Sequence, residues 1–297
     1  MIHKIVLISL LLISFSFANA QSEKTDAVYE EMTKEFIKVC LEKIAQNPNA
    51  LLISVSQNDS DKDGTCECPN CLAAEKEDGK SGLMLQFVNK VAAEIKKQYP
   101  DILVDTIAYH YTIHPPKKTR PADNVVIRFC PIEANYAQSL EDGPDNAELR
   151  KNLKEWSAIA PRLFIWNYVT NFRNYIFPHP NYRNLAKDIR FFIKNNAIGL
   201  FEQGDSGSNI GDFVRARAWI TQKLLWNPDL DEKKVAEEFF NGYYGAAGPY
   251  LMKYIDFLCD VIEASGVRLS CGYDFPDAWL KLEDIQKARK IYAEAEK

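Results

Sequence analysis

The sequence predicts an α/β protein: a partial (β/α)8 barrel, TIM-barrel-like, of about five parallel strands followed by a helical C-terminal region. Three observations predict it. The chain contains five apolar, β-branched runs, helical patterns separate most of them, and each run stops at a polar or acidic cluster. An uninterrupted apolar run is typical of a strand buried on both faces of a parallel sheet. Such sheets place their ligands at the carboxyl ends of the strands.

The elements follow in the order of a strand and helix repeat. The apolar runs lie at 51–59, 102–112, 124–135, 162–171 and 198–204. Before and between them, apolar residues recur at helical spacing over 27–46, 82–99, 147–159 and 182–195. The Pro- and Lys-rich connection between Thr112 and Asn124 has no such pattern and predicts a loop. After Asp212 the patterns indicate helices alone, over 213–226, 232–243, 249–265 and 279–297.

The domain boundaries follow from these elements. Residues 1–20 carry a basic residue, an apolar stretch and the small-residue signature Ala18-Asn19-Ala20, which is typical of a secretory signal peptide. We therefore expect a periplasmic or secreted protein. The partial barrel spans 21–211 and the helical region 212–297. A closed barrel needs about eight strands, so the missing ones are expected in an N-terminal barrel portion outside this chain.

Charge and composition limit the classes of partner that the chain is expected to bind. The formal net charge is −5 and the basic residues form no stripe, which argues against nucleic acid. Beyond the signal peptide, no run reaches the roughly 18 apolar residues of a membrane span, and no cysteine stands at the cleavage point to take a lipid anchor. We expect no membrane anchor and no cofactor.

The cysteines and one acidic loop raise the question of a metal. Cys66, Cys68 and Cys71 form a tight cluster that suits either a zinc site or a local disulfide. Since no second pair of cysteines or histidines stands nearby to supply a fourth zinc ligand, the disulfide is favoured. The loop that begins at Asp59, with Asp61, Asp63 and Gly64, copies the opening of a calcium loop, but the pattern then fails and a solvated acidic turn is favoured. No metal is expected.

Three carboxylates at strand ends suggest the chemistry. Paired Asp and Glu residues across a cleft are the groups that hydrolyse glycosidic bonds, and Glu133, Glu202 and Asp59 are the catalytic candidates. The alternative is that each pairs with a basic neighbour, such as Arg128, or caps a helix. Aromatic and amide side chains at the same strand ends are candidates for binding sugar rings and hydroxyl groups: Gln57, Asn58, Tyr109, Tyr111, Asn135, Trp166, Asn167, Tyr168 and Gln203.

Longer strings in the chain resemble a known family. The strings SVSQNDSDKDGTCECPNC, VDTIAYHYTIHPPKKTRPADNVVIRFCPIEAN, LFIWNYVTNF, GLFEQG and LLWNPDLD, with FFNGYYGAAGPY, closely resemble domain of unknown function family 4838, over about residues 47–260. That family corresponds to glycoside hydrolase family 163.

The resemblance implies a TIM-barrel glycosidase that acts on glycans or glycoproteins. For this family it implies a retaining endo-β-N-acetylglucosaminidase on complex N-glycans, in which the 2-acetamido group of the substrate attacks the anomeric carbon. The resemblance implies that Glu133 and Glu202 are the catalytic pair, without showing which is the acid. Asp59 or Asn58 is the further candidate for orienting the acetamido group. The alternative is a truncated barrel that binds carbohydrate without turnover.

Overall fold

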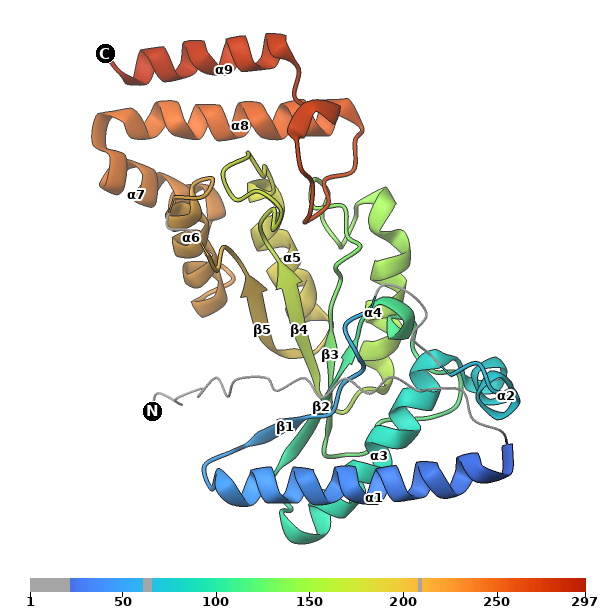
Figure 1. Ribbon diagram of the computed structural model, residues 1–297. Helices are drawn as coiled ribbons and strands as arrows, with labels where there is room; N and C mark the ends of the chain where they lie inside the picture. Colours follow the sequence, from blue (N-terminus) through green and yellow to red (C-terminus); the bar gives the residue numbers. More distant parts are fainter. Residues whose placement is uncertain (1–21, 61–65, 208–209) are drawn as a thin grey trace. The chain divides into compact units, whose positions relative to one another are not determined.

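The structure, a computed structural model, describes residues 22–60, 66–207 and 210–297. The expected signal peptide, and Asp61, Asp63 and Gly64 of the acidic loop, lie outside the described residues. Five parallel strands form one sheet in the order β1-β2-β3-β4-β5, which confirms the predicted partial barrel (Figure 1). The strands are β1 (Leu52–Ser54), β2 (Leu103–Ala108), β3 (Val125–Phe129), β4 (Leu163–Tyr168) and β5 (Ala197–Gln203).

The helices follow the predicted order with one addition. The short helix α2 was not predicted, because its apolar residues follow no helical stripe. The connection 113–124 contains neither helix nor strand, as predicted. The helices are α1 (Ser22–Gln46), α2 (Pro69–Asp78), α3 (Lys80–Gln98), α4 (Ala147–Ile159), α5 (Tyr182–Lys194), α6 (Val214–Trp226), α7 (Glu232–Tyr244), α8 (Gly248–Ser265) and α9 (Leu282–Ala295).

The chain divides into two compact units. Unit 1 is Met1–Cys130 with Lys154–Phe164, and unit 2 is Pro131–Leu153 with Ile165–Lys297. The division therefore passes through β4. The boundary at residue 211, drawn from the sequence, stays a prediction.

In unit 1, one face of the sheet packs against α3. The parallel register pairs Val104 with Val125 and Thr106 with Ile127, so these four side chains share a face. Leu85 of α3 lies against Thr106 and Ile127 on that face. Helix α1 packs on α3 in turn (Figure 1). The alternate residues of β2 and β3 therefore lie on the face away from α3.

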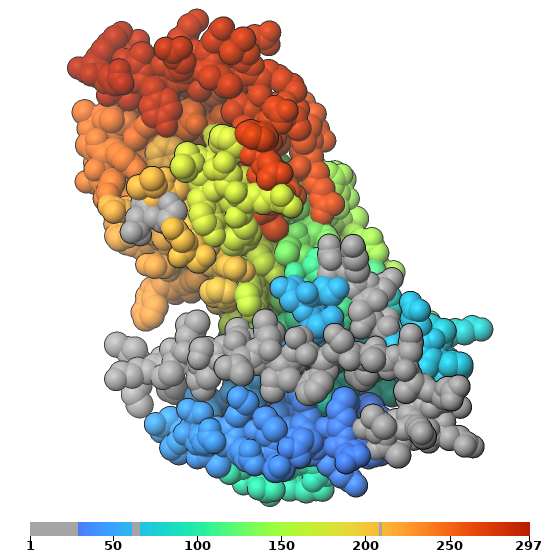
Figure 2. Space-filling model, viewed as in Figure 1, coloured from blue at the N-terminus to red at the C-terminus, as the bar shows by residue number. Residues whose placement is uncertain are grey.

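Unit 2 has its own apolar core beneath the helices. Its centre contains Leu185 and Ile189 of α5, Ile220 and Leu224 of α6, and Val169, with Leu200 of β5 packed against them. Helix α9 packs along α8, and Figure 2 shows its residues, in red, as the outer layer of this unit. None of the helices in the described part of the chain combines the length and the apolar character that a membrane span requires.

Candidate functional site

Consecutive residues at the ends of β4 and β5 lie on opposite faces of the sheet. Leu200 packs into the unit 2 core, so Glu202, two residues further along β5, lies on the same helix-covered face. Asn167 shares this face and donates from Nδ2 to Glu202 Oε2 at 2.9 Å. Gln203 lies on the opposite face, where Trp166 Nε1 donates to its Oε1 at 2.7 Å. The structure thus brings four predicted site residues together as two pairs, one on each face.

The Glu202 carboxyl has an unusual environment. One oxygen, Oε2, accepts from Asn167, while Oε1 is buried and has no hydrogen-bond partner among the described residues. Burial disfavours the charged form and raises the pKa of Glu202 from 4.5 to about 7, against the opposing effect of the Asn167 hydrogen bond. The group can therefore hold or release a proton near neutral pH, as a general acid or base requires.

Asp188 of α5 is a second buried carboxyl that the sequence analysis missed. Its Oδ1 accepts from the backbone N–H of Leu140 at 2.7 Å. Burial raises its pKa well above the ordinary value, and the negative charge of Glu202 raises it further. The signal was present in the sequence: Asp188 interrupts the apolar stripe of α5 made by Leu185, Ile189 and Phe192. A carboxylate on the apolar stripe of a helix is a candidate for a perturbed site.

Glu133 lies in the segment that follows β3. Burial raises the pKa of Tyr136 and that of Cys271, and the negative charge of Glu133 raises both further. Glu133 therefore lies near both side chains. Asn135, a predicted sugar-binding residue, is tied into the surrounding loop. Its Nδ2 donates to Asp145 at 2.8 Å, and its Oδ1 accepts from the backbone N–H of Leu269 at 3.0 Å. The Asn135 amide therefore holds loops together in this structure.

The aromatic candidates of unit 2, Trp166 and Tyr168, are two residues apart on β4 and lie on the face opposite Asn167. Trp166 packs edge-on against Phe201, with ring centroids 5.2 Å apart. Phe201 is 38% exposed, so the face of β5 that carries Gln203 is open to solvent. Tyr168 is buried and packs edge-on against Phe172. Trp166 and Gln203 are thus the predicted binding residues that lie beside an accessible aromatic ring.

Five predicted residues come together in unit 1. The Tyr111 hydroxyl donates to Asn58 Oδ1 at 2.7 Å, and the Tyr109 hydroxyl donates to Asp59 Oδ1 at 3.2 Å. Gln57 is buried; its Nε2 donates to the carbonyl of Tyr109 at 3.0 Å and its Oε1 accepts from Thr112. Burial raises the pKa of Tyr111 to about 12. The segment after β1 is thereby fastened to the segment after β2.

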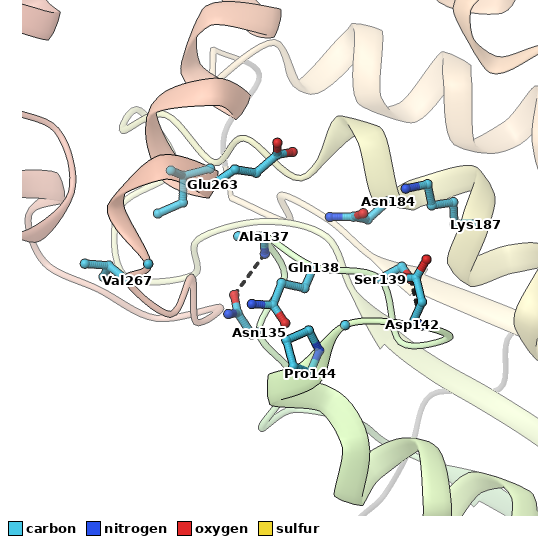
Figure 3. Close-up of a pocket in the computed structure, with 13 residues that line it drawn as sticks. Asn135, Ala137, Gln138, Ser139, Asp142, Pro144, Asn184, Lys187, Glu263 and Val267 are labelled. Atoms are coloured by element: carbon cyan, nitrogen blue, oxygen red, sulfur yellow. Dashed lines mark hydrogen bonds between the residues drawn. The ribbon is translucent and has the colours of Figure 1, made fainter.

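A separate pocket of about 400 Å³ lies in unit 2. Figure 3 shows Asn184 and Lys187 of α5 and Glu263 of α8 on one side, with Gln138 and Pro144 on the other. Its lining also includes Asn135, but neither Glu133 nor Glu202. The pocket is therefore distinct from the Asn167 and Glu202 pair.

The unfolding free energy is expected to fall as the pH rises through the titration of Glu202. The folded-state pKa of about 7 lies above the ordinary 4.5, so the folded chain holds an extra proton between these values. Across this window the unfolding free energy falls by on the order of 3 kcal/mol. Glu202→Gln should remove that part of the pH dependence. Urea unfolding measured from about pH 5 to about pH 8 checks this. An equal change of the unfolding free energy with pH in the two proteins would contradict it.

Comparison with solved structures gives distant likenesses, of which one is described here. A solved structure described as a GH138 enzyme targeting pectin rhamnogalacturonan II is similar to this chain with a TM-score of 0.33 and 15% sequence identity. The likeness covers 62% of this chain, which spans 28% of the length of that one. A search among curated proteins finds no match. The model of a family described as Domain of unknown function (DUF4838) matches residues 24–256, and the chain belongs to that family.

Proposed function

We propose that this chain is a glycoside hydrolase in which Glu202 serves as the acid/base group. The observation that carries the proposal is a carboxyl at the end of a parallel strand whose pKa burial raises to about 7. A general acid works best when its pKa lies near the operating pH, and the carboxyl ends of parallel strands are where barrel enzymes place such groups. Asn167 orients Oε2, and the proton is assigned to Oε1, which is buried and has no hydrogen-bond partner among the described residues.

The substrate and the mechanism come from the family resemblance of the sequence. We propose an exported endo-β-N-acetylglucosaminidase, of the glycoside hydrolase family 163 type, that acts on complex N-glycans. The oxygen of the substrate's 2-acetamido group attacks the anomeric carbon while Glu202 donates its proton to the departing glycosidic oxygen. Glu133 polarises the acetamido group, and water then opens the cyclic intermediate as Glu202 takes a proton back, which retains the anomeric configuration.

Each unit, considered by itself, carries polar and aromatic candidates for binding a sugar. In unit 2, Trp166 and Gln203 offer a ring and an amide on the open face of β5. In unit 1, Tyr109 and Tyr111 hold Asp59 and Asn58 by their hydroxyl groups. Each group suits recognition of sugar hydroxyls by hydrogen bonds.

A second candidate function is carbohydrate binding without turnover. One observation favours it: Glu202 lies on the helix-covered face with Oε1 buried, while Gln203 and Trp166 lie on the other. Under this alternative, Glu202 is a neutral core residue and the open face binds the glycan.

A glycan release assay separates the two functions. The purified chain is incubated with a glycoprotein that carries complex N-glycans, and released glycan is measured by mass spectrometry. The hydrolase is expected to leave a single N-acetylglucosamine on each asparagine. Binding of the same glycoprotein without release would favour the second function, and neither binding nor release would contradict both.

A further inference from the structure

The short segment C-E-C-P-N-C gathers three thiols in unit 1. The seven cysteines all lie among the described residues and are free thiols, so the local disulfide expected from the sequence is not present. The Sγ atoms of Cys66, Cys68 and Cys71 all lie within 4.8 Å of one another. These three thiols are partly exposed, whereas the other four are buried: Cys40, Cys130, Cys259 and Cys271.

Local geometry explains why the three sulfurs converge. Cys68 has extended backbone angles and occupies the N-cap of α2, with Pro69 at the first helical position. Cys71 is the third residue of the helix, a position whose side chain reaches back to the N-cap. The first helical hydrogen bond, from Leu72 N–H to the Cys68 carbonyl at 3.0 Å, fixes this turn. Cys66 precedes Cys68 by two residues, the spacing that returns a side chain to the same side of an extended chain.

The backbone of α2 is also arranged to favour a thiolate. Cys68 stands at the N-cap of α2, next to the backbone N–H groups of the first helical turn. Free N–H groups at a helix N-terminus carry partial positive charge, which stabilises an anion placed there. A thiolate is the form of cysteine that binds metal ions.

We propose that Cys66, Cys68 and Cys71 bind one Zn²⁺ through three thiolates, with water in the fourth position. Tetrahedral coordination at a Zn–S distance of about 2.3 Å places the sulfurs about 3.8 Å apart, within the observed limit of 4.8 Å. Binding releases the three thiol protons to solvent. Among the described residues, no further His, Cys, Asp or Glu joins the group. A disulfide would use two of the sulfurs and leave the third as a free thiol.

The zinc ion serves to hold the segment between β1 and α2. That segment carries Gln57, Asn58 and Asp59, which the residues after β2 hold at its other end. Because the metal binds the folded turn, it stabilises the end of this segment that joins α2.

Metal titration tests the site directly. The full chain is purified under reducing conditions, stripped with a chelator, and titrated with Zn²⁺ against a chromophoric chelator and separately with Co²⁺. We expect one ion per chain and, for Co²⁺, thiolate charge-transfer absorption with the visible bands of tetrahedral coordination. Cys68→Ser and Cys71→Ser should each weaken binding more than about 100-fold, a loss larger than that caused by altering an outer-shell partner. Cys271→Ser, which removes a buried thiol outside the cluster, should bind as the wild type does.

Thiol reactivity gives a second measurement. In the native, metal-free chain three thiols should react rapidly with a disulfide reagent, and Zn²⁺ should protect them. A Co²⁺ spectrum without thiolate bands, or equal Zn²⁺ affinity in Cys68→Ser and the wild type, would overturn the proposal. So would a disulfide between two of the three cysteines, found by peptide mass in protein isolated without reductant.

Discussion

Replacing Glu202 with Gln is expected to lower glycan release about 100- to 10,000-fold, the contribution that a positioned general acid makes to such a reaction. Gln keeps the shape of the side chain and accepts the hydrogen bond from Asn167, but it has no proton to donate to the leaving oxygen. The rate of release by wild type and variant, measured on the same glycoprotein, checks this. Since the pKa of Glu202 is about 7, the wild-type rate should also fall above neutral pH, where the acid loses its proton.

A matched control separates catalysis from a general effect of the substitution. Glu283 is exposed on α9, and Glu283→Gln should release glycan at the wild-type rate. Full activity in Glu202→Gln, with loss in Glu133→Gln, would move the acid role to Glu133. If the wild type binds the glycoprotein but releases no glycan, and Glu202→Gln binds it equally tightly, the chain is a binding protein.

Replacing Arg128 with Met is expected to destabilise the protein by about 3–5 kcal/mol, the cost of breaking a buried ion pair by removing one partner. Arg128 Nη2 lies 2.7 Å from Asp105 Oδ2, and the two side chains are 14% and 0% exposed. Burial raises the pKa of Asp105, and the Arg128 charge opposes this rise. Without Arg128, the carboxyl must stay buried unpaired or take up a proton. Urea unfolding at neutral pH measures the loss.

A second variant and a surface control test the assignment. Adding Asp105→Asn to Arg128→Met should recover much of the lost stability, because no unpaired charge remains buried. Lys96→Met breaks an exposed pair with Asp123 and should cost less than about 1 kcal/mol. A loss in Arg128→Met no larger than that in Lys96→Met would contradict the buried ion pair. An unchanged loss in the double variant would assign it to the packing of Arg128 over Phe164 instead.

Local patterns predicted much of the fold. The five apolar runs became β1 to β5, although the face of β5 that carries Phe201 is open to solvent. The helices with strong apolar stripes, such as α5 and α8, were predicted within a few residues of their ends. Helix α2 was missed because it is short and its start depends on Pro69 and the Cys68 N-cap rather than on an apolar stripe.

The candidate site was predicted less completely. Position along the strand indicated Glu202 and Gln203 as a group, yet they lie on opposite faces because consecutive strand residues alternate. Asp188 comes from helix α5, so the effect of the Glu202 charge on the pKa of Asp188 depends on tertiary contact. Asn135 resembled a sugar ligand in sequence, but the loops around it use its amide.

The sequence by itself determined the parallel strands, most helices and the positions of polar residues at the strand ends, since each depends on local apolar periodicity. It also determined the convergence of Cys66, Cys68 and Cys71, which lie within one turn of chain. Only the tertiary structure decided which face carries each carboxyl, and that burial raises the pKa of Glu202 to about 7. The physical reason is that burial and charge at a side chain are set by groups from distant elements, here α5 and β4, whose approach no local pattern encodes.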